Sequence, residues 1–465
     1  MEGTDNVISI EANNVTVTNN GTITTTGTQI DGASSAIYID APGGGRGGGG
    51  GNNAIIFNTG TISSTGLNTD AIYVKGNSLI INNSGTITST SGSSIKLFGA
   101  TGATINLNEG SKLIGVINSD NDYTLNMNVG ASKSYYISSS GSGGMTVNDL
   151  DNRPVISGSA YAVNIGSMEM ASENLYQKTS NVISAIDRNI NHTSWFHSYH
   201  QNAQRNAHGS SSAVRKFDNY QKGVTVGGLI EQSETPLQLI VDLNESENNI
   251  DRGEHIIKSD GWMIGLAFPH VKTIDDYSLS LKSLVGVSSS QTFRKILDNT
   301  SATGERIITG DYHSFNTILG ANLNKLVESN NGLRTSFSYG IDIVSERRKL
   351  YSESLYFSYD KLHLIQLQPK ASYQWNYTVN DISNTYVHLG LEAREIISGK
   401  TQYFSANNTQ TSYYVPNNND VYKTIAIGFN SAIEDKMKFF AEVNAKHSSE
   451  EVIHYQASIG FRATF

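Results

Sequence analysis

The chain has 465 residues, a formal net charge of −9 and a charged fraction of only 16%. This acidic balance excludes the broad basic surface that nucleic-acid binding requires, so no nucleic-acid partner is predicted. No apolar run reaches the roughly 18 residues of a membrane-spanning helix, whereas the strands of a transmembrane β-barrel alternate in polarity and are compatible with such a sequence. Cysteine is absent, which excludes disulfides, thiolate metal sites and thiol nucleophiles, and we predict no cofactor and no metal.

Composition divides the chain into two architectures. Residues 1–150 hold 25 of the 44 glycines but only 7 of the 41 aromatic residues, so the aromatic residues are concentrated in the remainder. We predict three parts, which are a repetitive segment at 1–165, a linker helix at 166–192 and an alternating-strand domain at 193–465.

The first part contains an internal repeat. The phrase at 19–23, Asn-Asn-Gly-Thr-Ile, returns with small changes at 58–62 and 83–87, and Ala-Ile-Tyr at 36–38 returns at 71–73. Short Thr/Ile/Val strands separated by Asn and Gly turns, repeated once per coil, are typical of a parallel β-helix. The Gly-rich insert at 43–51 lacks the GxxxxGK[ST] pattern of a phosphate-binding loop, and we interpret it as a loop extruded from one coil.

Catalytic motifs are scarce in the repeat. No histidine precedes His192, and neither a Ser–His hydrolase motif nor a zinc-protease motif is present. Carboxylate pairs could still serve a polysaccharide-degrading enzyme. The available acids are Asp31, Asp40, Asp70, Glu109, Asp120 and Asp122. Each lies among Gly, Asn or Ser, so turn formation is the simpler interpretation.

Residues 172–190 have the 3.6-residue periodicity of an amphipathic helix. The apolar side includes Leu175, Val182, Ile183 and Ile186. Such a helix would be about 28 Å long, close to the roughly 30 Å apolar thickness of a bilayer. It is too polar to face lipid, so it would fit a water-accessible pore or, alternatively, pack on a soluble domain.

The third part consists of long segments in which apolar and polar residues alternate. In the final run, Tyr455, Ile459 and Phe461 share one face with other apolar residues, while Arg462 lies on the opposite face. About twelve such segments are expected, near 193–203, 220–232, 236–248, 255–269, 276–291, 308–325, 333–346, 360–375, 384–397, 420–432, 437–447 and 452–465. Their length exceeds that of ordinary sandwich strands and favours a membrane barrel, with apolar residues toward lipid and polar residues toward the lumen.

This pattern predicts an all-β fold class: an N-terminal parallel β-helix, a pore-spanning α-helix and a 12-stranded antiparallel transmembrane β-barrel. An even strand number suits a closed antiparallel bacterial barrel. The predicted lumen-facing charged residues are Asp242, Glu392, Arg394, Glu442 and Arg462.

The NxGTI repeats, the linker helix, the barrel strands and the terminal aromatic alternation resemble bacterial type V autotransporters. The resemblance implies that Tyr455, Ile459, Phe461 and Phe465 form the signal read by the outer-membrane barrel-assembly machinery. It further implies periplasmic chaperones and the outer-membrane lipid bilayer of a Gram-negative bacterium as partners, a monomeric barrel, and a passenger displayed on the cell surface. Since Met1–Asn6 has no basic segment followed by an apolar stretch, an exported chain would be a mature or truncated form.

For function, the repetitive Thr, Asn and Ser surface favours an adhesin that recognises an unknown host or surface receptor, without a catalytic step. The alternative is a polysaccharide-degrading β-helix, whereas a plain diffusion porin leaves the repeats unexplained. Some members of the family resembled here cleave their linker at an asparagine. This helix offers Asn174 and Asn181 without a paired Asn-Asn, and we expect the passenger to stay attached.

Overall fold

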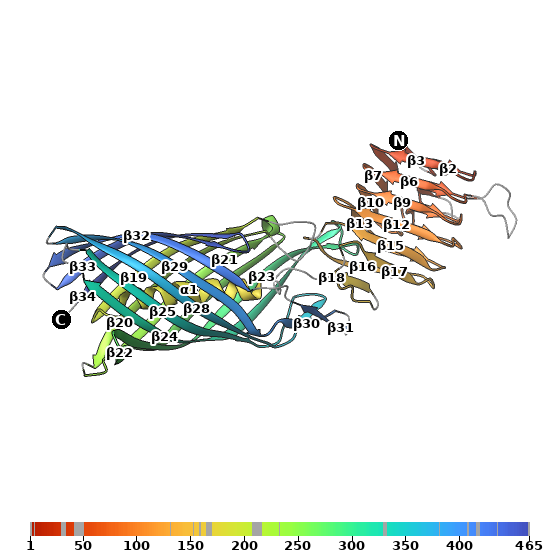
Figure 1. The fold of residues 1–465 in the computed structure, drawn as a ribbon. Coiled ribbons are helices and arrows are strands. Elements are labelled where there is room, and N and C mark those ends of the chain that lie inside the picture. The colour runs from red at the N-terminus through yellow and green to blue at the C-terminus, as the bar shows by residue number, and fades with distance from the viewer. Residues whose placement is uncertain are drawn as a thin grey trace.

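The computed structural model contains a stack of short strands joined to a barrel with a helix inside it (Figure 1). The structure describes residues 2–3, 5–28, 34–40, 51–130, 132–151, 153–157, 160–163, 170–206, 216–231, 233–328, 333–380, 382–406, 409–414, 419–434 and 436–463. The predicted Gly-rich loop at 43–51 lies almost entirely outside these residues, and so does Phe465.

The N-terminal stack consists of three parallel sheets, to which successive coils each add one strand. The first sheet holds β1 (Glu2–Gly3), β4 (Thr22–Thr25), β7 (Thr61–Ser64), β10 (Thr86–Ser89) and β13 (Lys112–Ile114). The second holds β2 (Ile8–Ile10), β5 (Ser35–Ile39), β8 (Asp70–Val74), β11 (Ile95–Leu97), β14 (Ile117–Ser119) and β16 (Ser134–Ser140). The third, here called sheet C, holds β3 (Thr16–Asn19), β6 (Ile55–Asn58), β9 (Ile80–Asn83), β12 (Ala103–Asn108), β15 (Tyr123–Asn128) and β17 (Met145–Asp149).

The repeats seen in the sequence are neighbours in these sheets. Ile62 pairs with Ile23 on one side and with Ile87 on the other, all fully or nearly buried. The turn asparagines form a second, polar column inside the stack, in which Asn58 accepts from Asn19 at 2.8 Å and donates to Asn83 at 2.7 Å. Similar residues recur at equivalent positions of adjacent coils because these side chains stack in columns, where isoleucines pack on one another and asparagines hydrogen-bond to one another.

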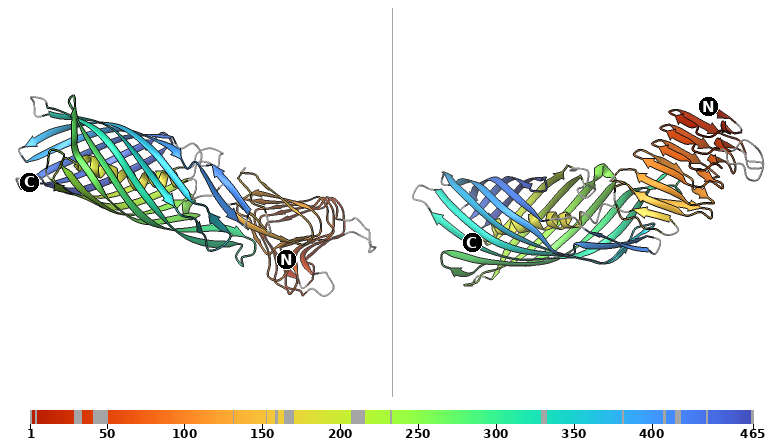
Figure 2. Two further views of the ribbon diagram at one scale, coloured as in Figure 1. Left: turned by 90° about the horizontal axis from the view of Figure 1, so that it is seen from below. Right: turned by 45° about the vertical axis from the view of Figure 1, so that its right-hand side comes forward.

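The barrel consists of twelve antiparallel strands, and closes by pairing of its first and last strands. The strands are β19 (Ser194–Arg205), β20 (Phe217–Glu231), β21 (Leu237–Ile250), β22 (His255–Ile274), β23 (Tyr277–Asp298), β24 (Glu305–Glu328), β25 (Leu333–Arg348), β28 (Leu362–Asn380), β29 (Ser383–Ser398), β32 (Asp420–Glu434), β33 (Met437–Ser448) and β34 (Val452–Ala463). Helix α1 (Ala171–Asn189) runs through the barrel (Figure 2). The predicted fold class, with parallel sheets at the N-terminus, one helix and a closed barrel, is confirmed.

Several strands, including β22, β23, β24 and β28, continue beyond the ends that the alternation indicated. β23 and β24 have 22 and 24 residues and continue past their predicted limits of 276–291 and 308–325. Their extension meets the stack, because β16 pairs with β23 in parallel, with Tyr135 opposite Leu297. The sequence could not show this, since a strand that leaves the lipid no longer needs one apolar face.

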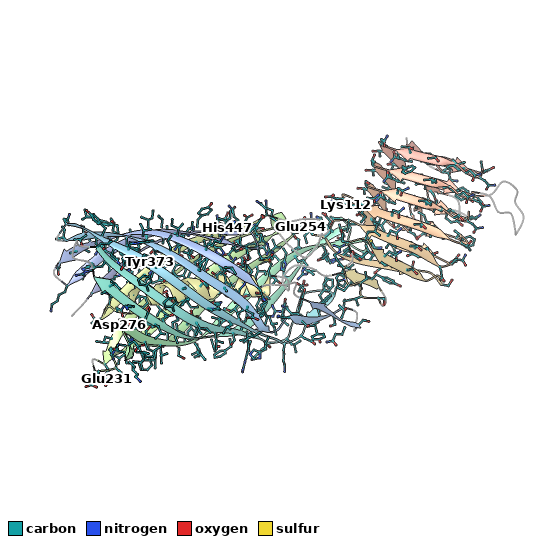
Figure 3. All side chains as sticks on the ribbon, viewed as in Figure 1. Lys112, Glu231, Glu254, Asp276, Tyr373 and His447 are labelled. Carbon is teal, nitrogen blue, oxygen red and sulfur yellow. The ribbon has the colours of Figure 1, made fainter. Side chains whose placement is uncertain are left out.

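A polar residue and two ion pairs complete this junction. The side chain of Asn299 accepts from the backbone N–H of Ser138 at 2.9 Å and donates to its carbonyl at 2.8 Å, as a further strand would do. Lys133 pairs with Glu254 at 2.6 Å, and Lys112 with Glu305 at 3.2 Å. Figure 3 shows Lys112 and Glu254 near the junction, while Glu231 and Asp276 lie at the opposite end of the barrel.

A small sheet at the end of the barrel nearest the stack, here called the loop sheet, was not predicted. It contains β26 (Tyr351–Ser352), β27 (Phe357–Tyr359), β30 (Thr401–Ala406) and β31 (Thr409–Tyr414), in this order. Its Phe357 and Phe404 share an apolar core with Ile308 of the barrel, and with Tyr136 and Ala162 of the last coil, which lie on β16 and on β18 (Ala160–Val163). The short 3₁₀ turn η1 (Asp251–Gly253) joins β21 and β22. The last coil of the stack, the loop sheet and the adjacent end of the barrel therefore share one apolar cluster.

Candidate functional site: the helix-filled barrel lumen

The outer wall of the barrel is apolar over a broad belt. Every strand contributes at least one large apolar side chain that is exposed; one from each strand, in chain order, is Phe196, Val226, Leu243, Trp262, Val285, Leu319, Ile341, Tyr377, Leu389, Ile427, Val443 and Ile459. Exposing such a belt to water would be unfavourable, whereas contact with lipid hydrocarbon would not be. The barrel is therefore of the membrane-spanning, outer-membrane type.

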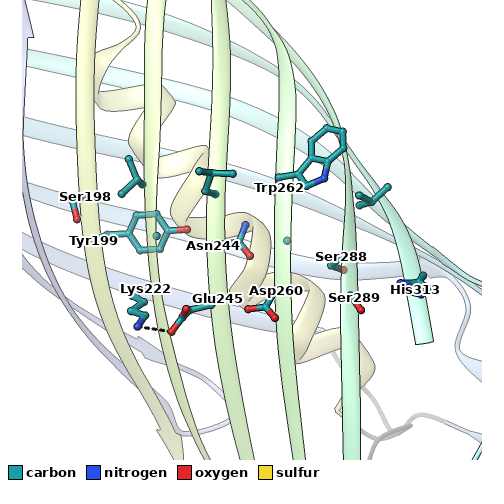
Figure 4. A pocket seen from close by; sticks show the side chains of 15 residues that line it. Ser198, Tyr199, Lys222, Asn244, Glu245, Asp260, Trp262, Ser288, Ser289 and His313 are labelled. Carbon is teal, nitrogen blue, oxygen red and sulfur yellow. Dashed lines mark ion pairs between the residues drawn. The ribbon is translucent and has the colours of Figure 1, made fainter. Parts of the chain in front are cut away.

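On β20–β22, a row of charged side chains marks the edge of the apolar belt nearest the stack. Lys222, Glu245 and Asp260 are directly opposite one another on adjacent strands, and Lys222 pairs with Glu245 at 2.5 Å (Figure 4). The next outward-facing row contains Leu243 and Trp262, which are also cross-strand partners. A charged row directly beside an apolar row marks the boundary between headgroups and hydrocarbon.

The five charged residues predicted to face the lumen all lie on inward-facing positions of their strands. Asp242 is bonded within the wall, where it accepts from Thr225 at 2.7 Å and from Asn244 at 2.6 Å. The other four, Glu392, Arg394, Glu442 and Arg462, contact the helix.

One side of α1 packs on the barrel wall through apolar side chains. Leu175, Val182, Ile183 and Ile186, the residues predicted for the apolar side, belong to a buried cluster to which β21–β25 contribute Ile240, Met263, Leu284, Ile318 and Val344. These inward-facing wall residues interrupt the otherwise polar lumen. The helix therefore lies against one half of the wall instead of standing free on the barrel axis.

A polar and aromatic cluster surrounds the first turns of α1, at the end of the barrel nearest the stack. Glu173 accepts from the Arg394 guanidinium at 2.6 Å and from the Tyr422 hydroxyl at 3.3 Å. Tyr176 stacks on Tyr422 with ring centroids 4.3 Å apart, and donates to Glu392 at 3.3 Å. Because the Glu173 carboxylate and the Tyr176 and Tyr422 hydroxyls have hydrogen-bond partners, their burial costs less free energy than burial of unpaired groups would.

A second polar cluster surrounds the last turns of α1. Asp187 accepts from Lys282 at 2.5 Å and also pairs with Lys370, and both lysines contact Asp342 of the wall. Arg188 pairs with Glu442 of β33. One turn of helix thus contacts strands on both sides of the lumen.

The same region fixes the end of the helix. The Asn189 side-chain oxygen accepts from Arg462 at 2.6 Å, and Gln238 donates to the carbonyl of Ile190 at 2.8 Å. Arg462 belongs to β34, the strand that closes the barrel. Helix position and barrel closure are therefore linked by a direct contact.

Four wall residues of these clusters, Glu392, Arg394, Glu442 and Arg462, were predicted from the sequence, whereas Lys282, Asp342, Lys370 and the helix partners were not. Glu173, Asp187 and Arg188 lie on the predicted polar side of the helix, and polarity alone gave no indication of which strand each would meet. Tyr176 and Tyr422 carried no signal beyond the general abundance of tyrosine. A weak signal was available, because a helix too polar for lipid must find polar partners wherever it is buried.

Three of the four residues of the assumed assembly signal are described. Tyr455, Ile459 and Phe461 lie on β34 and are about half exposed on the outer wall, at 54%, 55% and 45%. Phe465 lies outside the described residues. The apolar face of the last strand is thus open to the membrane side of the barrel.

The two helix asparagines considered for self-cleavage are buried in α1. Asn181 donates to Gln221 of β20 at 3.0 Å. Asn174 is 6% exposed. The wall acid Asp242 bonds to Thr225 and Asn244 instead of to either helix asparagine.

The described part of the chain holds no helix with the length and apolar character that a membrane span requires. Nor do its His, Asp and Glu side chains gather in any group of three or more that could hold a metal ion.

The class that the fold and the site define is a transmembrane β-barrel whose lumen is filled by its own helix. No protein-family profile and no curated protein matches the chain. Among solved structures, it is similar to the translocator domain of the autotransporter NalP from Neisseria meningitidis, with 13% identity, 64% of this chain and 98% of that chain covered, and a TM-score of 0.49. It is also similar to the transport unit of AIDA-I from Escherichia coli (11%, 65%, 100%, TM-score 0.44) and to the β domain of BrkA from Bordetella (11%, 58%, 98%, TM-score 0.41). The fold class predicted together with the resemblance to autotransporters, a closed 12-stranded barrel with a single helix, is the one that the structure contains.

Proposed function

We propose that the protein is an outer-membrane autotransporter, whose barrel mediates export and surface display of its own β-helical segment. The observation that carries this proposal is the path of the chain. The β-helix lies at one end of the barrel, α1 passes through the lumen, and β19 begins at the opposite end beside Ala463, the last residue that the structure describes. A chain threaded in this way has its N-terminal part on one side of the membrane and the start of its barrel on the other.

External protease on intact cells tests the topology. Residues 1–150 should be removed, and residues 193–465 should survive as a fragment of roughly 30 kDa, the size of one compact domain. Mass spectrometry before protease treatment should find the β-helix and the barrel in one covalent species, since we propose that the helix asparagines do not cleave. Full protection of residues 1–150 would contradict outward display, and a barrel species beginning at Leu175 or Val182 would contradict retention.

Assembly is proposed to depend on recognition of β34 by periplasmic chaperones and the barrel-assembly machinery. Deletion of Phe465 should reduce the amount of folded barrel in the outer membrane, because it removes the end of the signal while leaving the described wall contacts intact. Heat-modifiable gel mobility of the membrane fraction measures this. Truncation of one exposed side chain elsewhere, Leu319→Ala, is the control, and equal amounts of folded barrel in all three proteins would argue against the signal.

The displayed segment is proposed to act as an adhesin. Its support is the outer face of sheet C, where an uncharged lattice of hydroxyl and amide groups repeats in register. An outward-facing column of asparagines, distinct from the buried column described above, is hydrogen-bonded along its length: Asn106 donates to Asn82 at 2.8 Å, and Asn126 donates to Asn106 at 2.7 Å. A parallel column contains Thr104 and Thr124, which are cross-strand partners. Regular spacing offers many weak contacts at once, as adhesion to an extended surface needs.

A charge placed in the lattice tests this role. Thr104→Lys and Thr124→Lys should reduce adherence of displaying cells to cultured epithelial cells, because each puts an ammonium group into a neutral contact face. Ser142→Lys, in an exposed turn between β16 and β17, is the matched control. Adherence that stays equal for all three variants would show that sheet C is not the contact surface.

The alternative of a polysaccharide-degrading enzyme finds less support. Asp40 is paired with Lys75 at 2.7 Å, and Asp122 accepts from the backbone N–H of Gly144 at 2.7 Å. Burial raises the pKa of Asp70, but this carboxyl is only 3% exposed, inside the stack, where no polymer can reach it. Asp31 lies outside the described residues.

A further inference from the structure

The barrel lumen is filled unequally along its length. Beside α1 runs a cavity of about 690 Å³, lined on the helix by Ser184 and Asp187 and on the wall by β22–β25, β28, β29 and β32–β34. At the end of the barrel remote from the stack, the cavity reaches Asp276, Lys325 and Lys438. On β22–β25 the cavity is lined by residues near the strand ends remote from the stack, such as Lys325, whereas α1 packs on apolar residues of these strands that lie nearer the stack, such as Ile318.

The cavity ends where the cluster around Glu173 begins. Glu392 and Thr424 line its upper part. The next inward-facing residues toward the stack, on the same two strands, are Arg394 and Tyr422, which are 2% and 0% exposed.

These two wall residues contact Glu173 and Tyr176 on the first turns of the helix. The Arg394 guanidinium lies 5.3 Å from the ring centroid of Tyr176 and 5.5 Å from that of Tyr422, so the cation is held beside this stacked pair of rings and against Glu173. Gln366 of β28 donates to the carbonyl of Ser172 at 2.6 Å, which ties the first turn of the helix to a further strand. A cation paired with both a carboxylate and aromatic faces is costly to separate in a water-poor site.

The side chains that line the cavity below carry a net positive charge, although four of the basic ones are ion-paired: Arg188 with Glu442, Lys325 with Asp276, Lys370 with Asp187 and Asp342, and Lys446 with Glu392. Three acidic side chains line it, Asp187, Asp276 and Glu392. Six basic side chains line it, Arg188, Lys325, Lys370, Lys438, Lys446 and Arg462. A cleft with a surplus of one sign of charge concentrates ions of the opposite sign.

We infer that the barrel is a one-sided vestibule: an anion-attracting, water-filled chamber open to the side opposite the β-helix, and sealed at the β-helix end by Glu173, Tyr176, Arg394 and Tyr422. The permeability barrier of the protein is this seal, rather than the whole length of the helix. The chamber itself has the chemistry of an anion pathway that the seal keeps closed. This assignment holds whether or not the chain exports its own β-helix.

Conductance of the purified full chain in planar bilayers tests the seal. The unmodified protein should give no resolved channel, whereas Tyr176→Ala should open steps that are selective for chloride over potassium. Tyr386→Ala removes the same side-chain atoms from the cavity wall below the seal, where Tyr386 bonds to Glu442 at 2.7 Å, and should stay closed. Equal conductance from both variants, or cation selectivity of the open one, would overturn the inference.

Cysteine labelling decides the question even if Tyr176→Ala does not fold. The chain has no cysteine, so single substitutions can be read without background. In vesicles with the β-helix outside, Ser184→Cys should react with charged methanethiosulfonates supplied inside and resist those supplied outside, with the anionic reagent about tenfold faster than the cationic one. Ser172→Cys, within the seal, should resist both. Outside labelling of Ser184→Cys, or a faster cationic reagent, would refute a sealed basic vestibule.

Discussion

Gly227→Val is expected to remove most of the folded barrel from the outer membrane. Gly227 lies opposite Trp195 on the neighbouring strand, and an added Cβ would be 2.2 Å from the indole ring. The indole ring of Trp195 would have to move away from the backbone at residue 227, and this overpacking should lower the free energy of unfolding by about 3 kcal/mol. Trp195 also donates to Gln238 at 3.2 Å, and Gln238 donates to the carbonyl of Ile190 at the end of α1. Displacement of the ring should therefore also weaken the attachment of the helix to the wall.

The adjacent residue provides a matched control. A Cβ at Gly228 would meet nothing within 4 Å, because this residue faces outward. Gly228→Val should therefore assemble normally, and a time course of heat-modifiable mobility for both variants measures the difference. If both valines slow assembly equally, β propensity or strand stiffness is responsible instead of the contact with Trp195.

Asp187→Ala is expected to loosen the helix within the lumen. The substitution takes one of two carboxylates away from Lys282 and Lys370, leaving only Asp342 to compensate two buried cations. The unpaired charge should lower the free energy of unfolding by about 2 kcal/mol. The urea midpoint, followed by tryptophan fluorescence of the reconstituted full chain, measures the loss.

Ser184→Ala is the control for this experiment, because Ser184 lines the cavity one turn earlier and no ion pair depends on it. Its midpoint should match that of the unmodified protein. An Asp187→Ala midpoint that also matches would show that Asp342 and water solvate both lysines without help from the helix.

Much of the architecture followed from local patterns. The repeated Asn-x-Gly-Thr-Ile phrase predicted coil-to-coil pairing, and Ile62 indeed lies between Ile23 and Ile87. Strict alternation from Ile453 to Phe461 assigned the two faces of the last strand. The predicted helix at 172–190 differs from Ala171–Asn189 by one residue at each end. In each case the signal is a period set by backbone geometry, so one stretch of sequence carries it.

What the sequence by itself determined is therefore the set of elements and the faces they present to lipid, water or core, because side-chain periodicity is a property of each segment alone. Only the tertiary structure decided which segments meet. Arg394 and Glu173 are 221 positions apart, and Asp187 and Lys370 are 183 apart. The β23–β24 extension, the loop sheet and the one-sided vestibule likewise depend on where a closed barrel with fixed register and tilt brings its strands. Polarity alone says that a buried charge needs a partner, whereas the register of twelve strands selects that partner.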